Sequence, residues 1–378
     1  MNLQPYLKLM SEQQASDMYF TTGAPVSVRI EGSMRPVGKS MLNPGMTKKL
    51  AYDLLTPDRI KEFEKNLELN LGISYTDLGR FRINIYMQRG EVSMVIRYIK
   101  ADIPTLDELG LPDIYKTMIA RKKGLVLVVG ATGMGKSTSL ASMLDYRNMT
   151  ESGHILTIED PIEFVFRHKK CIVGQREVGL DTLSFENALR EAMREAPDVI
   201  MIGEARDRET MESALRYADA GHLCLTTLHA TNANQTLDRI LNFFPVDAHN
   251  QILMDLSLNL NCILAQRLVK MKDGSRVAAI EVLVNTPYIS KLIRKGDFHE
   301  IKEIMAKGGV SGMMTFDQSL FELFKSHKID LESALANADS SSELEWKINF
   351  GGGTNELLGK EEKQEDLQLP DSLPDSND

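Results

Sequence analysis

The stretch that decides the fold is Gly130-Ala131-Thr132-Gly133-Met134-Gly135-Lys136-Ser137, which matches the phosphate-binding pattern G-x-x-x-x-G-K-[ST] in full. An apolar run, Leu125–Val129, precedes it, and residues 136–147 after it have a helix-forming composition. A strand, a glycine-rich turn and a helix N-terminus form a cradle in which backbone N–H groups converge on phosphate oxygens. The sequence therefore predicts a site for ATP or GTP.

The expected ligands of this turn are a nucleotide, with ATP preferred, and Mg²⁺. The Lys136 ammonium is expected to reach the β- and γ-phosphates, and the Ser137 hydroxyl is expected to hold Mg²⁺. The other expected nucleotide contacts are Gly130, Ala131, Thr132, Gly133, Met134, Gly135 and Thr138.

Length and composition indicate a soluble protein of two domains. The chain has 378 residues, which exceeds one ordinary core, and it is 43% hydrophobic and 26% charged. No apolar run approaches the roughly 18 residues of a membrane span. Residues 1–5 lack the basic and apolar segments of a secretory signal. We therefore expect a cytoplasmic protein.

The cysteines argue against disulfides and against a structural zinc knuckle. Cys171, Cys224 and Cys262 are odd in number and widely separated, and no C-x-x-C pair exists. Each lies among apolar residues, so buried thiols are expected.

Most of the net charge lies at the end of the chain. The net charge is −9, and residues 341–378 contribute −7 of it through ten acidic and three basic residues. The rest of the chain is close to neutral. No basic surface for nucleic acid is therefore expected.

Changes in composition divide the chain into four segments. Residues 1–100 predict a small mixed α/β domain, and residues 101–122, with Pro104, Gly110 and Pro112, predict an interdomain linker with a short helix. Residues 123–338 predict an α/β ATPase domain. Residues 339–378 contain serine, glycine and acidic runs and predict a disordered tail.

Apolar strands alternate with amphipathic helices from Gly124 onward, which is typical of a mainly parallel sheet. The expected strands are 125–129, 154–158, 198–203, 222–228, 268–271 and 277–284. The longest expected helix covers residues 247–264.

Acidic residues follow two of these strands. Glu159, Asp160 and Glu163 come after the strand 154–158, where a parallel sheet places its ligands. An acid there is expected either to act on water or Mg²⁺, or to be an ordinary acidic helix start. Glu204 follows the buried strand Val199–Ile202, the arrangement of a Walker B acid. Asp198 opens that strand, roughly 20 Å away, and is excluded from phosphate chemistry.

His222 and His229 bracket the strand between them. Its length of ~23 Å is too great for both to bind one zinc ion. We expect His229 to face the γ-phosphate and His222 to contact a neighbouring element or subunit.

Arg82 and Arg97 lie on two expected strands of the N-terminal domain, and their positions alone do not define a role for them.

Four motifs together resemble one family. Gly130–Ser137 is similar to its Walker A motif, Thr157–Phe164 to its aspartate box, Val199–Glu204 to its Walker B motif and Gly221–Ala230 to its histidine box. Their order and spacing resemble the secretion ATPase superfamily, the hexameric motors of type IV pili and type II secretion. The resemblance covers residues 1 to about 338.

Within this superfamily the chain resembles the pilus-retraction ATPases of the PilT/PilU family. Residues 15–18 are similar to the opening A-S-D-hydrophobic segment, and Gly79–Asn84 to the arginine-bearing strand. Tyr288–Lys295 agrees with the pattern A-I-R-N-L-I-R-E of the PilT branch at four of eight positions. That departure, with the acidic tail, points to the PilU-like branch.

The resemblance implies a PAS-like N-terminal domain, a RecA-like core, and nucleotide bound between them. It implies that Glu163 and His229 are catalytic, that Glu204 acts on Mg²⁺, and that Arg82 and Arg97 reach the phosphates from the N-terminal domain. It also implies a homohexamer at the inner-membrane base of the pilus. The implied partners are a PilC-like platform protein and a PilT-like retraction ATPase.

Two alternatives stay open. One is an assembly ATPase of the same superfamily, although such enzymes usually carry a longer N-terminal region and a tetracysteine zinc element. The other is a nucleotide-sensing regulator with vestigial hydrolysis, against which the intact Lys136, Ser137, Glu163 and Glu204 count.

Overall fold

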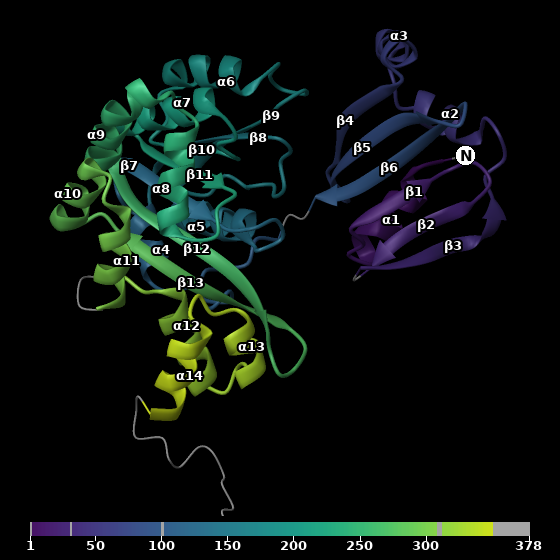
Figure 1. Cartoon of the computed structure of the whole chain (residues 1–378). Helices are drawn as coiled ribbons and strands as arrows, with labels where there is room; N and C mark the ends of the chain where they lie inside the picture. Colours follow the sequence, from purple (N-terminus) through teal and green to yellow (C-terminus); the bar gives the residue numbers. More distant parts are fainter. Residues whose placement is uncertain (1, 31, 100–101, 308–311, 351–378) are drawn as a thin grey trace, which may run out of the picture.

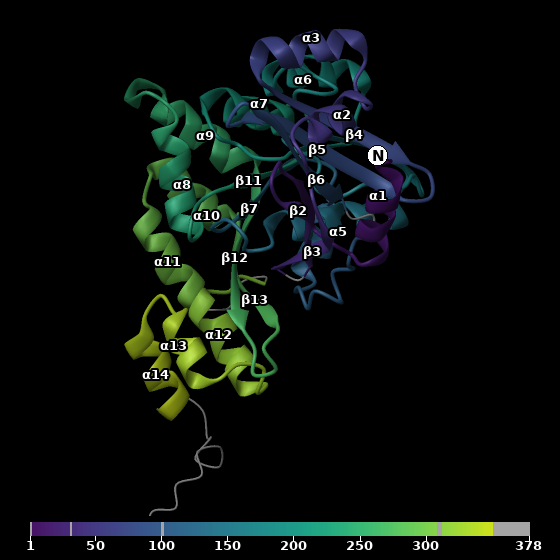
Figure 2. The same cartoon turned by 90° about the vertical axis from the view of Figure 1, so that its right-hand side faces the viewer.

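The computed structural model describes residues 2–30, 32–99, 102–307 and 312–350. Figure 1 shows two bodies, each built on one β-sheet. The view in Figure 2, turned by 90°, shows the N-terminal sheet in front of the upper part of the larger body. The larger body carries the phosphate-binding turn.

The N-terminal sheet is antiparallel in every pairing and has the order β3-β2-β1-β6-β5-β4. Alternation along β5 gives this sheet two different faces. Phe81, Ile83 and Ile85 are buried in the core, whereas Arg80 and Arg82 lie on the opposite face. The strands and helices of this body are β1 (Asp17–Phe20), β2 (Pro25–Ile30), β3 (Ser33–Met41), β4 (Glu68–Tyr75), β5 (Gly79–Gln88), β6 (Glu91–Ile99), α1 (Gln4–Glu12), α2 (Met46–Tyr52) and α3 (Pro57–Asn66).

The C-terminal sheet has the order β13-β12-β7-β11-β10-β8-β9. Its pairings are parallel except for the edge strand β13, which is antiparallel to β12. The parallel strands therefore end along one edge, where this architecture places ligands. The strands are β7 (Gly124–Val129), β8 (Gly153–Glu159), β9 (Cys171–Glu177), β10 (Val199–Ile202), β11 (Leu223–Leu228), β12 (Leu260–Lys270) and β13 (Arg276–Val284).

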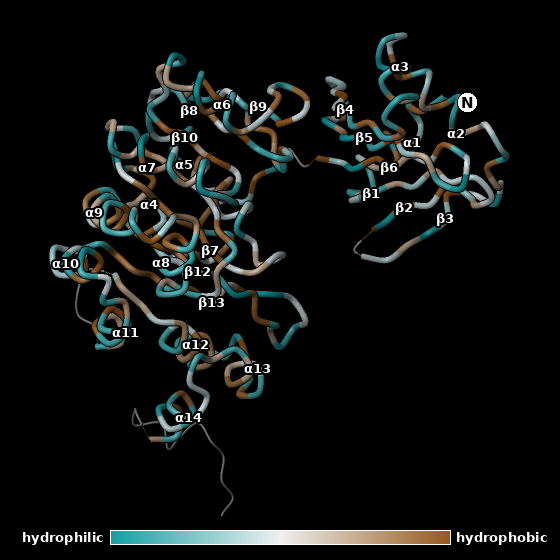
Figure 3. The backbone as a smooth tube through the Cα atoms, turned by 45° about the horizontal axis from the view of Figure 1, so that its top comes forward, coloured by the Kyte–Doolittle hydropathy of each residue, from teal (hydrophilic) through white to brown (hydrophobic). Residues whose placement is uncertain are grey.

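Helices cover both faces of this sheet, and β7 separates two cores. Leu125, Leu127 and Val129 face one core, and Val126 and Val128 face the other. The tube in Figure 3 changes between brown and teal along the surrounding helices, which turn their apolar side to the strands. These helices are α4 (Ile114–Ile119), α5 (Lys136–Thr150), α6 (Phe185–Ala192), α7 (Arg208–Asp219), α8 (Ala233–Asn242), α9 (His249–Asn259), α10 (Pro287–Lys295), α11 (Phe298–Ala306), α12 (Phe316–Lys325), α13 (Leu331–Ala336) and α14 (Ser341–Phe350).

The helix expected over residues 247–264 is wrong at its C-terminal end. Helix α9 ends at Asn259, and β12 begins at Leu260. The run Leu260–Leu264 is apolar enough for either element. Pairing with β7 on one side and β13 on the other makes it a strand.

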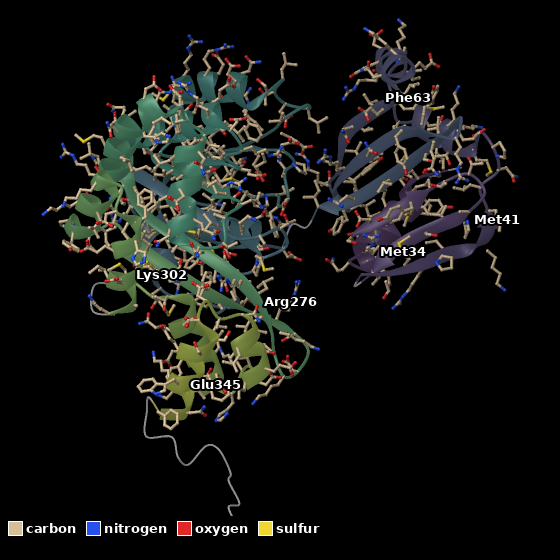
Figure 4. All side chains as sticks on the ribbon, viewed as in Figure 1. Met34, Met41, Phe63, Arg276, Lys302 and Glu345 are labelled. Carbon is tan, nitrogen blue, oxygen red and sulfur yellow. The ribbon has the colours of Figure 1, made fainter. Side chains whose placement is uncertain are left out.

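The expectation of a disordered tail from Asp339 is wrong for residues 341–350, which form α14. Leu344 and Ile348, one helical turn apart, are buried against α12 and α13. Asp339 joins this region to the sheet and to α11, because it pairs with Arg267 at 2.6 Å and with Lys302 at 3.3 Å. Figure 4 labels Lys302 on α11 and Glu345 on α14. Residues 351–378 of the expected tail lie outside the described residues.

We predict that helix α14 (residues 341–350) contributes to the stability of the folded protein. Deletion of residues 341–378 should lower the melting temperature by several degrees, because losing one buried leucine already costs about 2–5 kcal/mol. Deletion of residues 351–378 should leave it unchanged. Leu344→Ala and the exposed Glu345→Ala are the matched point variants, measured by calorimetry. Equal melting temperatures for both deletions would contradict the docking of α14.

Candidate functional site

The phosphate-binding turn leaves β7 where only glycine fits. A Cβ on Gly130 would stand 2.7 Å from the Gln266 backbone oxygen, so a side chain there requires the loop or β12 to move. Gly135 caps α5 in the left-handed conformation at φ +81°. Helix α5 then begins at Lys136, and its first N–H groups face the turn.

The Lys136 side chain folds back over this turn. Its Nζ atom donates hydrogen bonds to the Gly130 oxygen at 2.8 Å and to the Ala131 oxygen at 3.0 Å. Burial lowers the pKa of Lys136, while Glu204 and Glu163 act in the opposite direction. The lysine is thus placed among carboxylates and carbonyls, where an anionic ligand would stabilise its charge.

A cavity of about 210 Å³ lies between this turn and the ends of the neighbouring strands. The sheet order places β11, β10 and β8 beside β7, so the residues that follow these strands meet at one edge. Half of the fourteen residues predicted to bind nucleotide or act in catalysis line the cavity. Among the residues lining it are Thr132, Gly133, Lys136, Ser137, Glu159, Asp160, Glu163, Glu204, Arg206, Thr227 and His229.

Glu204 is the centre of a polar network in this cavity. Its Oε1 atom lies 2.9 Å from His229 Nε2, and its Oε2 atom accepts a hydrogen bond from Arg206 Nε at 2.9 Å. Arg206 Nη1 also lies 3.4 Å from Asp160 Oδ2. The carboxylate is therefore fixed from two sides, and it faces the same space as Ser137.

Asp198 and His222 lie at the end of the sheet opposite the cavity, as the lengths of their strands predicted. Asp198 accepts a hydrogen bond from the His154 backbone N–H at 2.8 Å. His222 Nδ1 lies 3.3 Å from the backbone oxygen of Tyr217, and the His222 and Tyr217 rings pack edge to face. Neither residue contributes to the cavity wall in the described part of the chain.

Arg82 and Arg97 are cross-strand neighbours on β5 and β6. Arg97 Nε donates to Asp17 Oδ1 at 2.9 Å, and Arg82 Nε lies 4.0 Å from Glu177 Oε1. Within the described residues the structure does not place either arginine in the cavity wall. Their contact with phosphates stays a prediction.

A second cavity, of about 630 Å³, lies on the other side of the first turn of α5. Gly135 and Thr138 border it on the P-loop side, and Leu268 and Arg276 border it on the hairpin of β12 and β13. Figure 4 labels Arg276 on this hairpin. Residues 107–111, in the segment before α4, close its remaining side.

Arg206 and Thr227 are functional residues of the cavity that the sequence did not predict. Arg206 lies two residues after Glu204, and a search for cations after the Walker B acid finds it. Thr227 lies on β11, two residues before His229, and its hydroxyl donates to the Gly203 backbone oxygen at 2.8 Å. Only the pairing of β10 with β11 reveals that contact.

No three His, Cys, Asp or Glu side chains within the described ranges gather closely enough to hold a metal by themselves. Mg²⁺ in phosphate-binding turns takes one or two protein oxygens and completes its shell with phosphates and waters. The Ser137 hydroxyl and the Glu204 carboxylate supply such oxygens on one cavity wall. The residues present therefore fit Mg²⁺ bound together with a nucleotide.

Comparison with known proteins identifies the family. The model of the family described as "Type II/IV secretion system protein" matches residues 2–339. The chain belongs to this family. It is 51% identical to the type IV pilus ATPase PilU of Pseudomonas aeruginosa over 352 residues, which cover 93% of this chain and 92% of that protein. It is 41% identical to the type IV pilus retraction ATPase PilT of the same organism, over 89% of this chain and 98% of that protein.

A solved structure extends the similarity to the fold. The crystal structure of the pilus retraction motor PilT with bound ADP matches with a TM-score of 0.85 and 43% identity, over 91% of this chain and 99% of that chain. The resemblance to the PilT/PilU family is confirmed. The expected fold class, a RecA-like core with a smaller PAS-like domain, is confirmed as well.

Every helix in the described residues is too short or too polar to cross a lipid bilayer.

Glu159 lies in the cavity wall but is itself deeply buried. Burial raises its pKa to about 7, although hydrogen bonds from Thr157 and Gln175 lower it. The folded state therefore keeps a proton that the unfolded chain loses near the ordinary glutamate pKa of 4.5. Stability from this group is present at low pH and is lost as the pH rises through about 7.

We predict that Glu159→Gln becomes more stable relative to the native chain as the pH rises from 5 to 8. The gain is at most about 3 kcal/mol, because one pKa unit corresponds to about 1.4 kcal/mol. Urea unfolding at several pH values measures it, with the exposed Glu322→Gln as the control. If the difference in the free energy of unfolding between Glu159→Gln and the native chain stays constant across this pH range, the raised pKa of Glu159 is contradicted.

Proposed function

We propose that this chain is an ATP-hydrolysing motor subunit of type IV pilus retraction that acts as a PilU-like accessory to a PilT-like ATPase. The observation that carries the proposal is the cavity where a complete phosphate-binding turn meets Glu163, Glu204 and His229. Similarity to PilU over 93% of the chain supports the pilus assignment.

The nucleotide lies across the first turn of α5. Its phosphates bind the N–H groups of the turn, and the γ-phosphate enters the first cavity beside Lys136 and Ser137. Its adenosine part occupies the second cavity, which borders Gly135 and Thr138 on the opposite side of the same turn. A phosphate oxygen offers Lys136 a stronger, charge-assisted partner than the two carbonyls.

Glu204 and Glu163 have different roles in hydrolysis. Ser137 and Glu204 hold Mg²⁺, which neutralises charge on the β- and γ-phosphates when it is bound. Glu163 orients the attacking water or accepts its proton, and His229 faces the γ-phosphate from the end of β11. Arg82 and Arg97 reach the phosphates when the N-terminal sheet closes over the cavity, and their charge stabilises the transition state.

The active assembly is a homohexamer at the inner-membrane base of the pilus. Turnover moves its rigid units and transmits force to a PilC-like platform protein. No basic surface for nucleic acid is part of this proposal. The family relationship supports the assembly, since the family model matches residues 2–339.

Helix α10 supports the accessory role. Ser290, which stands where the PilT pattern has arginine, donates its hydroxyl to the Ser257 oxygen of α9 at 2.7 Å. Tyr288, in place of alanine, bonds Glu300 of α11 through its hydroxyl. These side chains tie α10 to its neighbours through contacts that the PilT pattern does not provide. The difference concerns coupling to partners and leaves the nucleotide site complete.

The assembly ATPases are the second candidate, and the cysteines count against them. A tetracysteine zinc element needs four cysteines, and this chain has three, all buried. ATP turnover by the purified protein separates both motors from a nucleotide-sensing regulator.

We predict that Glu163→Gln binds ATP normally and hydrolyses it about 10²–10⁴-fold more slowly, because the amide keeps the shape and loses the charge that acts on water. Turnover and binding of a fluorescent ATP analogue measure the two effects. Lys136→Ala is the reference variant and should lose hydrolysis entirely. Equal loss of affinity and turnover in Glu163→Gln would instead make Glu163 a binding residue.

We predict that a strain with this protein as its only retraction ATPase retracts pili poorly. Adding a PilT-like ATPase should restore retraction, with greater force than the PilT-like ATPase produces alone. Fluorescently labelled pili and micropillar deflection measure the two quantities, and Lys136→Ala in this chain is the control. Robust retraction by this protein alone would refute the accessory role.

A further inference from the structure

Glu177 is a buried carboxylate at the boundary between the two bodies. It ends β9, lies opposite Glu159 of β8 in the strand register, and its side chain is only 2% exposed. The turn after it is tight, since the Glu177 oxygen accepts the N–H groups of Leu180, Asp181 and Thr182. This turn fixes the backbone of Glu177 at the end of β9.

Two arginines of the N-terminal sheet reach this carboxylate. Arg80 Nη2 lies 3.6 Å from Glu177 Oε2, and Arg82 Nε lies 4.0 Å from Oε1. The same turn contacts the N-terminal sheet a second time, because Leu180 Cδ1 lies 3.3 Å from the place that a Cβ on Gly72 would take. Gly72 and Arg82 are paired in β4 and β5. The contact therefore combines two charged pairs with close apolar packing.

The carboxylate also holds the loop before Glu163. The Ile162 N–H, in the loop after β8, donates to Glu177 Oε2 at 3.4 Å, and the Ile162 side chain is buried. Ile162 directly precedes Glu163, so this bond fixes the backbone from which Glu163 enters the cavity. One side chain thus joins the N-terminal sheet to the catalytic loop.

We propose that Glu177 is a positioning residue that couples the placement of the N-terminal sheet to the position of Glu163. This inference deepens the proposed function and rests on it for the role of Glu163. Arg80 and Arg82 favour the ionised form of the buried carboxylate against the effect of burial, and an ionised carboxylate is the stronger acceptor for the Ile162 N–H. Movement of the sheet that withdraws Arg80 from Glu177 loosens the loop.

The charge balance supports this coupling. Burial raises the pKa of Glu177, while the Ile162 N–H and then the Arg82 and Arg80 cations act against that rise. A buried carboxylate that loses its cations becomes strongly unfavourable. The loop and the arginines therefore depend on the same ionised group.

The first test is steady-state ATP turnover by the purified full-length protein. Glu177→Gln keeps the shape and an acceptor oxygen but removes the charge. The kcat should fall by about tenfold, with KM and affinity for fluorescent ADP unchanged, because Glu163 is displaced and the phosphate-binding turn is not. The matched control is Glu195→Gln. It breaks the 2.9 Å pair between Glu195 and Arg176, the neighbour of Glu177 on β9, and should leave kcat unchanged. An unchanged kcat in Glu177→Gln, or an equal loss in the control, would overturn the proposal.

The second test does not depend on hydrolysis. Arg80→Gln should increase hydrogen exchange in the peptide spanning residues 160–166, although Arg80 lies on the other sheet. Arg176→Gln is the control, since the Arg80 and Arg176 side chains are both 25% exposed and both pair with a glutamate. Unchanged exchange in Arg80→Gln, or an equal increase in Arg176→Gln, would refute the coupling. If Glu163→Gln hydrolyses ATP normally, the proposed role of Glu163 fails, and the exchange result still decides whether Glu177 links the sheet to the loop.

Discussion

The close approach of Gly130 to the backbone of β12 is the constraint on which the rest of the site depends. Parallel pairing of β7 with β12 places the Gln266 oxygen where a Cβ on residue 130 would lie, at 2.7 Å. The chain can turn there only without a side chain. That turn directs the following N–H groups toward one space and allows α5 to begin at Lys136.

Parallel packing then supplies the chemistry around the turn. Because β8, β10 and β11 all end at the edge where β7 ends, acidic residues far apart in sequence meet in one cavity. Crowding of carboxylates in a buried place has electrostatic consequences. Glu204 contacts Arg206 and His229, whereas burial raises the pKa of Glu159 to about 7. A site that accumulates negative charge in this way is suited to Mg²⁺ and a lysine, which bring compensating charge to the phosphates.

Three arginines of the N-terminal sheet, Arg80, Arg82 and Arg97, each lie beside a carboxylate. Arg97 is held by Asp17 within its own sheet, and Arg80 and Arg82 meet Glu177 of the other sheet. The two kinds of pair differ in consequence. The Arg97 pair lies within one sheet and joins an exposed arginine side chain, 61% exposed, to the buried carboxylate of Asp17, 5% exposed. The Glu177 contacts reach a buried group that also holds the catalytic loop, so the placement of the sheet and the loop are linked through one charge.

Sequence patterns alone were enough to predict the phosphate-binding turn, the acids after buried strands and the choice of Glu204 over Asp198. Those features depend on neighbouring residues and on the length of a strand, which are readable in one dimension. The sequence also predicted that Arg82 and Arg97 lie on strands of the N-terminal domain. It could not place the boundary between α9 and β12, since an apolar run fits either period until its partners β7 and β13 are known. Only the tertiary structure showed that α14 docks, that Arg206 holds Glu204, and that Glu177 receives two arginines from another sheet. Those contacts join residues distant in the chain, and their free energy depends on burial and on the partner's charge, which no local pattern encodes.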